Sequence, residues 1–289
     1  MNPAISNNNL KHLRKSGAKG KNRPIGVFDS GLGGLTAVKQ LIRFLPKENI
    51  VYLGDTARLP YGNKSKRTII KFSIQNTLYL FKFNVKLIVI ACNTSSSFAL
   101  NELKNNYRIP IIGVIEPGVR KALELTVNKR IGVIGTNATI DSNAYQKRIL
   151  KADPSIKIFA QSCPLFVPLV EEGWLGEKVT LDIIRKYLAP LKNKGIDTLI
   201  LGCTHYPLLK SSIKKIMGPT IKLVDSARQV ALSAKRLLDE KDIVSEHNRK
   251  GKAKFFLTDR PYKFKAIAER FLGQKFACVY RVKESDYEI

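Results

Sequence analysis

Residues 90–97, IACNTSSS, place a single cysteine after a run of aliphatic residues and before a run of small hydroxyl residues. A second stretch, LGCTHYPLL at residues 201–209, has the same arrangement: aliphatic residues, one cysteine and then a threonine. Short aliphatic runs that end in small or polar residues are typical of buried parallel strands. The sequence therefore predicts that Cys92 and Cys203 follow two strands. They are either buried structural thiols or a matched pair of reactive groups.

Comparable aliphatic segments occur along the rest of the chain and alternate with helical patterns. The predicted strands cover residues 25–28, 50–53, 87–91, 131–134, 156–160 and 199–201. The predicted helices between them cover residues 35–44, 69–81, 142–150, 181–191 and 230–238. A last strand, helix and strand are expected at residues 255–257, 264–272 and 277–282. Regular alternation of short strands and helices predicts an α/β fold.

An internal repeat relates the two cysteine-containing stretches. The sequence PIGVFDSG at residues 24–31 resembles RIGVIGTN at residues 130–137. Continuing this alignment pairs Ile50 with Ile156, and then Cys92 with Cys203. The two cysteines are therefore expected at equivalent places in two similar units.

The repeat predicts how the chain is divided and where a site would lie. Ligands of open parallel sheets bind beyond the carboxyl ends of the strands, so two similar domains facing each other would present one thiol from each side of a shared cleft. We expect two pseudo-symmetric parallel-sheet α/β domains with the active site between them. The first would contain residues 24–114 plus 230–289, and the second residues 115–229. Residues 1–23 form a basic tail whose low hydrophobicity predicts disorder.

Length and composition narrow the class of protein. A chain of 289 residues with 44% hydrophobic content can bury two cores of ordinary size. The aliphatic runs are far shorter than the ~20 residues of a membrane span, and the N-terminal segment lacks the apolar core of a signal peptide. We therefore expect a cytoplasmic protein without a membrane partner.

The four cysteines, Cys92, Cys163, Cys203 and Cys278, have no short C-x-x-C spacing and no histidine pair nearby. This spacing argues against a metal site and against a disulfide framework. We expect reduced thiols and no bound metal. Cys163 and Cys278 lack a partner in the repeat and are expected to be structural.

The formal net charge of +27, from 50 Lys and Arg against 23 Asp and Glu, raises the question of a nucleic-acid partner. The basic residues are scattered along the chain and form no arginine-rich arm with interleaved aromatic residues. We expect nucleic-acid binding to be at most weak and non-specific. A basic, non-enzymatic binding protein is the alternative, and it would bind DNA with a steep dependence on salt.

Two opposed thiols suit proton transfer at a carbon atom that is deprotonated on one face and reprotonated on the other, as in a racemase. A free cysteine has a pKa near ~8.5, so each thiol needs a neighbour or a dipole that stabilises its thiolate. The sequence offers a helix N-terminus after each cysteine, Asp29 at the end of the first strand, and His205. Taken alone, Asp29 could instead cap a turn, and His205 could be an ordinary hydrogen-bonded histidine.

An ordered set of motifs over residues 24–289 resembles the glutamate racemase family. In chain order the motifs are IGVFDSGLGGLT at residues 25–36, YLGDTARLPYG at 52–62, ACNTSSS at 91–97, GVIEPG at 113–118, CPLFVPLVEEG at 163–173 and LGCTHYPLL at 201–209. A further stretch, FFLTDRPYKFKAIAERFLG at residues 255–273, resembles the closing segment of the family. Racemases of aspartate and other small amino acids share the paired cysteines and form an alternative, but LPYG and CTHYP favour glutamate.

The resemblance implies a cofactor-independent enzyme, without pyridoxal phosphate, that interconverts L- and D-glutamate and supplies D-glutamate for peptidoglycan. It implies that Cys92 acts on D-glutamate and Cys203 on L-glutamate, and that Asp29, Glu171 and His205 support these thiols. Glu172 adjoins Glu171, and either carboxylate could face the site. The resemblance assigns substrate binding to Asp29, Ser30, Tyr61, Gly62, Asn93, Thr94, Thr204 and His205. It leaves open whether the chain forms a homodimer and whether a UDP-linked muramyl precursor activates it.

Overall fold

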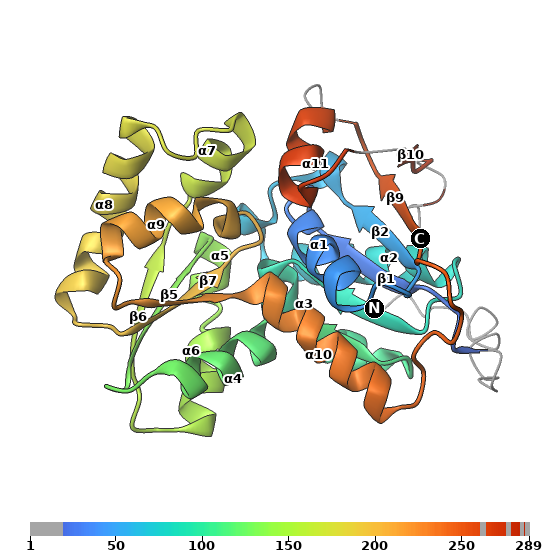
Figure 1. The fold of residues 1–289 in the computed structure, drawn as a ribbon, viewed down its shortest axis with the longest axis horizontal. Coiled ribbons are helices and arrows are strands. Elements are labelled where there is room, and N and C mark those ends of the chain that lie inside the picture. Colours follow the sequence, from blue (N-terminus) through green and yellow to red (C-terminus); the bar gives the residue numbers. More distant parts are fainter. Residues whose placement is uncertain (1–19, 261–263, 276–278, 284–285, 287–289) are drawn as a thin grey trace.

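The structure, a computed structural model, describes residues 20–260, 264–275, 279–283 and 286. These residues form two halves, each built on a parallel β-sheet with helices packed against it (Figure 1). Within this part of the chain, no helix is long and apolar enough to cross a membrane. The predicted α/β class with two parallel sheets is confirmed.

The first half contains a six-stranded sheet with the strand order β10-β9-β2-β1-β3-β4, in which all neighbours pair in parallel. Its strands are β1 (Ile25–Asp29), β2 (Ile50–Gly54), β3 (Leu87–Ile90), β4 (Ile111–Gly113), β9 (Ala253–Leu257) and β10 (Tyr280–Arg281). Its helices are α1 (Leu35–Phe44), α2 (Lys66–Phe81), α3 (Asn93–Asn106) and α11 (Phe264–Leu272), with the 3-10 helices η3 (Thr56–Arg58) and η4 (Tyr61–Asn63).

The second half contains a four-stranded parallel sheet with the strand order β6-β5-β7-β8. Its strands are β5 (Arg130–Gly135), β6 (Lys157–Ser162), β7 (Thr198–Gly202) and β8 (Lys222–Asp225). Its helices are α4 (Ile115–Leu125), α5 (Asn137–Asp141), α6 (Ala144–Ala152), α7 (Phe166–Glu172), α8 (Lys178–Asn193) and α9 (Lys210–Met217), with the 3-10 helix η5 (Tyr206–Leu209). Helix α10 (Ser226–Glu240) packs against α1 of the first half and α4 of the second.

Helices cover both faces of the first sheet, which explains why its central strands are continuous apolar runs. Val27 and Tyr52 belong to one apolar cluster with residues of α1 and α10. Their neighbours Phe28 and Leu53 belong to a second cluster with residues of α2 and α3. Successive side chains of a strand point to opposite faces, so each strand contributes to both clusters.

The strand pairing places the two cysteines at equivalent positions. Strand β1 lies between β2 and β3, as β5 lies between β6 and β7. Ile25 of β1 pairs with Leu87, five residues before Cys92. Ile131 of β5 pairs with Thr198, which is likewise five residues before Cys203. The equivalence predicted from the internal repeat is therefore confirmed for the cysteines.

The predicted equivalence of Ile50 and Ile156 is wrong by two residues. Ile25 pairs with Ile50, whereas its counterpart Ile131 pairs with Ile158. A shift of two residues keeps every side chain on the same face of a strand. The apolar pattern that suggested the alignment cannot distinguish these two registers.

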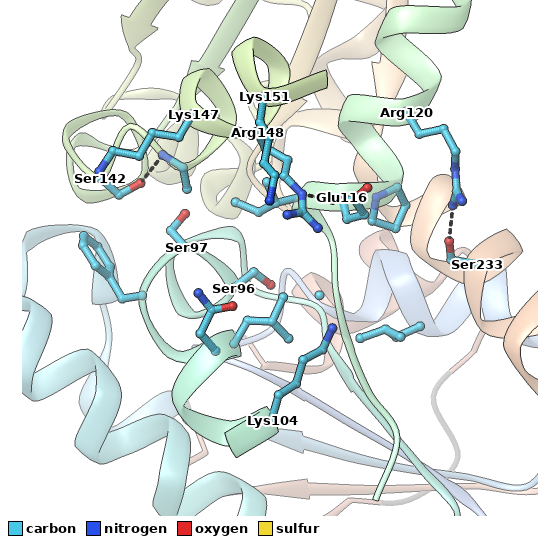
Figure 2. A pocket seen from close by; sticks show the side chains of 18 of the residues that line it. Ser96, Ser97, Lys104, Glu116, Arg120, Ser142, Lys147, Arg148, Lys151 and Ser233 are labelled. Atoms are coloured by element: carbon cyan, nitrogen blue, oxygen red, sulfur yellow. Dashed lines mark hydrogen bonds and ion pairs between the residues drawn. The ribbon is translucent and has the colours of Figure 1, made fainter. Parts of the chain in front are cut away.

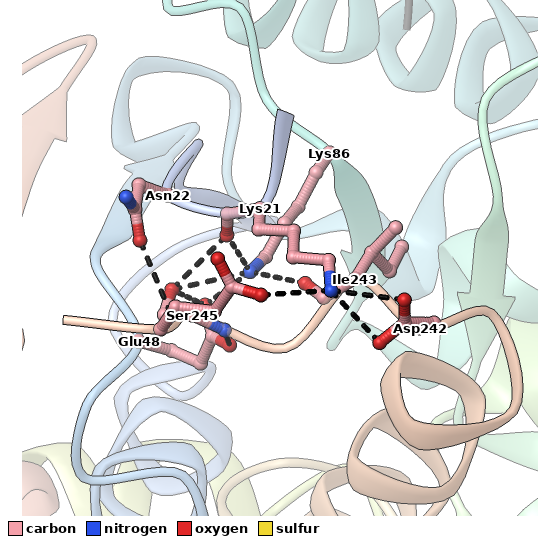
Figure 3. A network of polar contacts seen from close by, with 8 residues as sticks. Lys21, Asn22, Glu48, Lys86, Asp242, Ile243 and Ser245 are labelled. Atoms are coloured by element: carbon pink, nitrogen blue, oxygen red, sulfur yellow. Dashed lines mark hydrogen bonds and ion pairs between the residues drawn. The ribbon is translucent and has the colours of Figure 1, made fainter. Parts of the chain in front are cut away.

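The first described residues are held against the loop between α10 and β9 (Figure 3). Lys86 Nζ forms a 2.6 Å ion pair with Glu48 Oε2 and donates a hydrogen bond to the carbonyl of Lys21. Ser245 N donates to the Glu48 carboxylate at 2.8 Å, and Lys21 Nζ lies 2.9 Å from Asp242 Oδ1. Burial lowers the pKa of Lys86, and the contact with Glu48 opposes this effect. Residues 20–23 of the predicted tail are thus fixed to the fold, and residues 1–19 lie outside the described residues.

Candidate active site

A cavity of about 370 Å³ lies between the two halves and contains both Cys92 and Cys203. Its walls come from the segments that follow β1, β2 and β3 in the first half and β5, β6 and β7 in the second. These segments lie at the carboxyl ends of the two parallel sheets, where ligands of such sheets bind. All the predicted site residues except Asp29 line this cavity: Ser30, Tyr61, Gly62, Cys92, Asn93, Thr94, Glu171, Cys203, Thr204 and His205.

Cys92 precedes α3, and its sulfur caps the start of this helix. Sγ accepts a hydrogen bond from Ser95 N at 3.4 Å and lies 3.7 Å from Ser30 Oγ. Burial raises the pKa of the Cys92 thiol to about 11; the Asp29 carboxylate acts in the same direction, while the contacts with Ser95 and Ser30 oppose it. The N-terminus of a helix stabilises negative charge. The predicted helix after Cys92 is confirmed.

No α-helix begins directly after Cys203, so the prediction of a helix N-terminus at this cysteine is wrong. In α3, Ser96 N donates to the carbonyl of Cys92. The residue at the corresponding place after Cys203 is Pro207, which has no N–H to donate and whose ring would meet that carbonyl. The chain forms the 3-10 helix η5 instead, with Tyr206 N donating to the carbonyl of Cys203 at 3.2 Å.

His205 is the polar partner of Cys203. Its Nδ1 lies 3.9 Å from Cys203 Sγ, and its Nε2 lies 3.0 Å from Glu171 Oε1. Burial by itself lowers the pKa of His205, but the hydrogen bonds to Cys203 and Glu171 outweigh it and raise the pKa to about 10. The ring is therefore protonated at neutral pH and can donate to the sulfur and to the carboxylate. Of the two adjacent acids, Glu171 makes this contact and Glu172 is exposed.

Asp29 is fully buried and does not line the cavity. Its Oδ2 accepts a hydrogen bond from Gly31 N at 3.1 Å. Burial raises the pKa of Asp29, and the charge of His205 lowers it. The same carboxylate acts on the pKa of Cys92. Asp29 is thus coupled electrostatically to groups on both sides of the cavity from a position behind its wall.

Several predicted binding side chains are already engaged in contacts within the protein. The Tyr61 hydroxyl donates to the Asp55 carboxylate. Asn93 Oδ1 accepts a hydrogen bond from the Tyr145 hydroxyl at 2.7 Å, which joins α3 of the first half to α6 of the second. Thr94 Oγ1 lies 3.0 Å from Thr136 Oγ1. These contacts fix the shape of the cavity wall and connect its two sides.

A family model described as Asp/Glu/Hydantoin racemase matches residues 45–234. A glutamate racemase from Geobacter metallireducens is 45% identical over 260 residues, which cover 90% of this chain and 96% of the relative. The chain belongs to the glutamate racemase family. The crystal structure of the Francisella tularensis glutamate racemase in complex with D-glutamate matches with a TM-score of 0.86 at 42% identity, covering 92% of this chain and 99% of the other.

A more distant member of the family was solved with an activator. The Escherichia coli glutamate racemase, in complex with L-glutamate and the activator UDP-MurNAc-ala, matches with a TM-score of 0.73 at 27% identity. The alignment covers 90% of this chain and 98% of the Escherichia coli protein. The two-domain architecture of the family therefore extends over nearly the whole of both chains.

Thr136 is a lining residue that the sequence analysis did not single out. It follows β5, and its hydroxyl contacts Thr94 from the opposite half. The internal repeat contained the signal, because aligning PIGVFDSG with RIGVIGTN matches Thr136 to Ser30. The two halves of this family member thus contribute hydroxyl groups, as well as thiols, from equivalent positions.

The cavity wall contains little formal charge. Within the described residues no lysine or arginine lines it, and its charged groups are Glu171 and the protonated His205. In the same part of the chain, no three His, Cys, Asp or Glu side chains gather closely enough to hold a metal ion. Cys163 is fully buried and does not line the cavity, while Cys278 lies outside the described residues.

Proposed function

We propose that this chain interconverts L-glutamate and D-glutamate by proton transfer between the α-carbon and two thiols, Cys92 and Cys203. The observation that carries the proposal is the position of the thiols, which are both free, occupy equivalent positions in two sheets and line one cavity. Membership in the family, and the D-glutamate bound to the Francisella tularensis relative, support glutamate as the substrate. The D-glutamate formed would supply peptidoglycan synthesis.

In the direction from L- to D-glutamate, the thiolate of Cys203 removes the α-proton from one face of the substrate. The electron pair of the broken C–H bond stays on the α-carbon, and the thiol of Cys92 donates its proton to the opposite face. The products are D-glutamate, a Cys203 thiol and a Cys92 thiolate, which are the starting state for the reverse direction. The atoms and electrons balance without a further reactant, and we propose that the reaction uses no cofactor.

The two thiolates are stabilised by different groups. At Cys203 the protonated His205 ring can donate to the sulfur, and Glu171 holds the ring in its protonated form. At Cys92 the Ser95 N–H at the start of α3 points at the sulfur. Both devices place a donor or a positive partial charge beside a developing anion. Asp29 acts through the wall on both sites, and we propose that it is a supporting residue.

Substrate recognition depends mainly on neutral donors in this proposal. Since the described lining residues include no lysine or arginine, the two carboxylates of glutamate would be bound by hydroxyl groups, amides and backbone N–H groups. We propose that Ser30, Thr94 and Thr204 supply hydroxyls, and that Asn93, Tyr61 and Gly62 shape the wall. The hydroxyl of Tyr61 is held by Asp55, so this residue would act through its ring and backbone.

Isotope exchange tests the proposal directly. Purified protein is given one pure enantiomer of glutamate in D₂O without any added cofactor, and deuterium at the α-carbon is followed early in the reaction. Two separate thiols should introduce deuterium mainly into the product enantiomer. Equal early labelling of substrate and product would instead indicate one shared base and would exclude the two-thiol assignment. Cys92→Ser and Cys203→Ser should each lose orders of magnitude in rate, since a hydroxyl is far less acidic than a thiol.

A parallel assay with L-aspartate tests the alternative substrate. We expect racemisation of glutamate to exceed that of aspartate, because the family relatives of high identity are glutamate racemases. Faster turnover of aspartate by the purified protein would replace glutamate as the substrate in this proposal.

We further propose that an anionic activator binds in a second cavity, of about 570 Å³, which lies among α3, α4, α6 and α10 (Figure 2). Residues of α3 and α10 line one side and residues of α4 and α6 the other. Its lining carries two acidic residues, Glu116 and Glu240, and six basic ones: Lys104, Arg120, Lys147, Arg148, Lys151 and Arg236. The activator UDP-MurNAc-ala in the Escherichia coli relative is a phosphorylated anion of the kind that such a lining would attract.

The activator proposal is tested by measuring racemisation with and without UDP-MurNAc-ala. We expect a higher rate in its presence, and loss of that increase in Arg236→Met without a change in the basal rate. Lys210→Met serves as the control, because Lys210 is an exposed basic residue that does not line this cavity. A rate that is independent of the compound would exclude activation of this chain.

The remaining expectations of the sequence analysis stay predictions. The oligomeric state stays open, with a homodimer as one alternative. The other expectations are the domain boundaries at residues 114/115 and 229/230, a cytoplasmic location, and nucleic-acid binding that is at most weak and non-specific. The last is measured from the salt dependence of DNA affinity. A slope like that of a protein contacting six or more phosphates would favour the alternative of a nucleic-acid binding protein.

A further inference from the structure

Helix α11 belongs to the first half, where it packs against α1 (Figure 1). The side chain of Arg270 on this helix contacts the second half. Arg270 Nη1 donates to the carbonyls of Val170 and Glu171, and both distances are 2.9 Å. These carbonyls belong to the last turn of α7, where an α-helix runs out of its own donors. A cation at this end also complements the helix dipole. Arg270 therefore caps α7 from across the interface between the halves.

Gly173 allows the guanidinium to reach the end of α7. It follows the helix with φ +86°, a left-handed conformation that favours glycine. A Cβ atom at this position would overlap the Arg270 guanidinium. A glycine at this position therefore serves two purposes: it adopts the left-handed backbone angle, and its missing side chain leaves room for the Arg270 guanidinium.

Phe271, the residue after Arg270 in α11, contacts His205, which is the hydrogen-bond partner of Glu171. Phe271 is buried, and its ring lies edge-on to the His205 ring, with centroids 5.0 Å apart and an interplanar angle of 81°. Consecutive residues of one helix thus contact Glu171 through its backbone and His205 through its ring. Glu171, with a side chain that is 34% exposed, would otherwise have freedom to turn toward solvent.

We infer that Arg270 is a positioning residue: from the first half, it holds the end of α7 so that the Glu171 carboxylate faces His205 beside Cys203. The expected effect of Arg270 on the rate of racemisation rests on the proposed function. The expected effect of Arg270 on the position of Glu171 does not. Arg270 does not line the cavity and is not expected to touch the substrate. Its proposed role is to hold the Glu171 carboxylate of the second half toward His205, and this contact exists only while the two halves are packed together.

The ionisation of His205 distinguishes positioning from a simple effect of charge. The ring faces Cys203 and Glu171 and is coupled to Asp29, and the guanidinium of Arg270 contacts the main-chain carbonyl of Glu171. Removing a nearby cation alone would raise the pKa of His205. Displacing the Glu171 carboxylate would lower it, because a hydrogen bond to the protonated ring is lost. The two explanations predict shifts of opposite sign.

The test is an NMR titration of the histidine rings in the full-length protein. The chain has three histidines, and His205→Asn identifies the signal of His205. We expect its titration to move to lower pH in Arg270→Met, toward the position seen in Glu171→Gln, and less far in Arg270→Lys, which keeps one donor and the charge. An unchanged or higher pKa in Arg270→Met would overturn the inference. If that variant does not fold, the same comparison is made with Arg270→Lys against wild type.

Kinetics provide the second readout. We expect Arg270→Met to lower kcat for glutamate about tenfold or more, since small misplacements of catalytic groups cost this much. Lys265→Met removes an exposed positive charge from the same helix and should leave kcat and the His205 titration unchanged. An absence of racemisation by the wild-type protein would remove the proposed function, while the titration would still decide whether Arg270 positions Glu171. A wild-type kcat in Arg270→Met would show that the contact has no role in the reaction.

Discussion

His205 and Glu171 are joined by a 3.0 Å contact between Nε2 and Oε1, and this contact supports only one of the two thiols directly. Cys203 has a protonated ring beside it, whereas Cys92 faces a backbone N–H at the start of α3. Equivalent positions in the two sheets therefore have unequal surroundings. Two enantiomers have the same free energy, so the equilibrium constant of the reaction is one. The ratio kcat/KM must therefore have the same value in the two directions. The inequality can appear only in kcat and KM taken separately, or in isotope effects.

His205→Ala is expected to lower kcat for L-glutamate by about 10²-fold or more, the typical effect of losing a positioned acid–base partner. Glu171→Ala should cost less, because Glu171 acts through the ring and not on the sulfur. Initial rates at saturating L-glutamate measure both effects. A kcat of His205→Ala equal to that of wild type would make the histidine structural.

The pKa of His205 also predicts how stability depends on pH. Folding raises it from an ordinary value of 6.5 to about 10, so the folded state binds the proton more tightly than the unfolded state. The resulting stabilisation is fully present below about pH 6.5 and is lost as the pH rises through about 10. The free energy of unfolding in urea should therefore fall more steeply between pH 7 and pH 10 for wild type than for His205→Asn. Parallel curves for the two proteins would contradict the raised pKa.

Gly33 lies where a loop of the first half touches the Cys203 side of the cavity. A Cβ atom here would overlap Thr204 Oγ1 and His205 Nδ1. We expect Gly33→Ala to displace His205 and lower kcat by up to ~10²-fold, with a loss of stability of about 1–3 kcal/mol from overpacking. The control is Gly176→Ala at an exposed position with no neighbouring atoms, which should leave kcat and stability unchanged. Normal turnover in both variants would show that Thr204 and His205 can move away from the added methyl group without loss of activity.

The buried ion pair between Lys86 and Glu48 is expected to be costly to break. Lys86→Met leaves an unpaired buried carboxylate and should reduce the free energy of unfolding by about 3–5 kcal/mol. The double variant with Glu48→Leu should lose less than the two single variants together. Lys82→Met, which breaks an exposed pair with Asp286, is the control and should cost about 0–1 kcal/mol. Urea denaturation of these variants measures the differences.

Short and irregular elements explain where the sequence analysis missed parts of the fold. Helix α1 has the predicted bounds because a full amphipathic pattern extends over it. Strand β4 (Ile111–Gly113) has three residues, and β8 (Lys222–Asp225) begins and ends with a charged residue, so neither has a recognisable apolar run. Of the last predicted strand, residues 277–282, the structure shows β10 at Tyr280–Arg281, while residues 277–278 lie outside the described residues.

The candidate site could be predicted where a residue's neighbours are adjacent in sequence. The helix that begins after Cys92 is of this kind. Pro207 decided the opposite outcome after Cys203, and its missing N–H could have been used as a signal. The contact of Arg270 with Glu171 joins segments 99 residues apart and depends on how the two halves meet. The motif at residues 255–273 contains Arg270, but no local pattern of residues contains information about this contact.

The network around Lys86 has a consequence for proteolysis. The peptide bond after Lys21 satisfies the sequence preference of trypsin, but its carbonyl oxygen accepts hydrogen bonds from Lys86 Nζ and from Ser245 Oγ at 3.1 Å. A protease must pull several residues into an extended strand before it cuts. Here that would require breaking these two hydrogen bonds and the ion pairs of the Lys21 side chain with Asp242 and Glu246. Resistance of this one bond during limited digestion therefore reports whether the junction between the N-terminal segment and the α10–β9 loop is intact, independently of any assay of turnover.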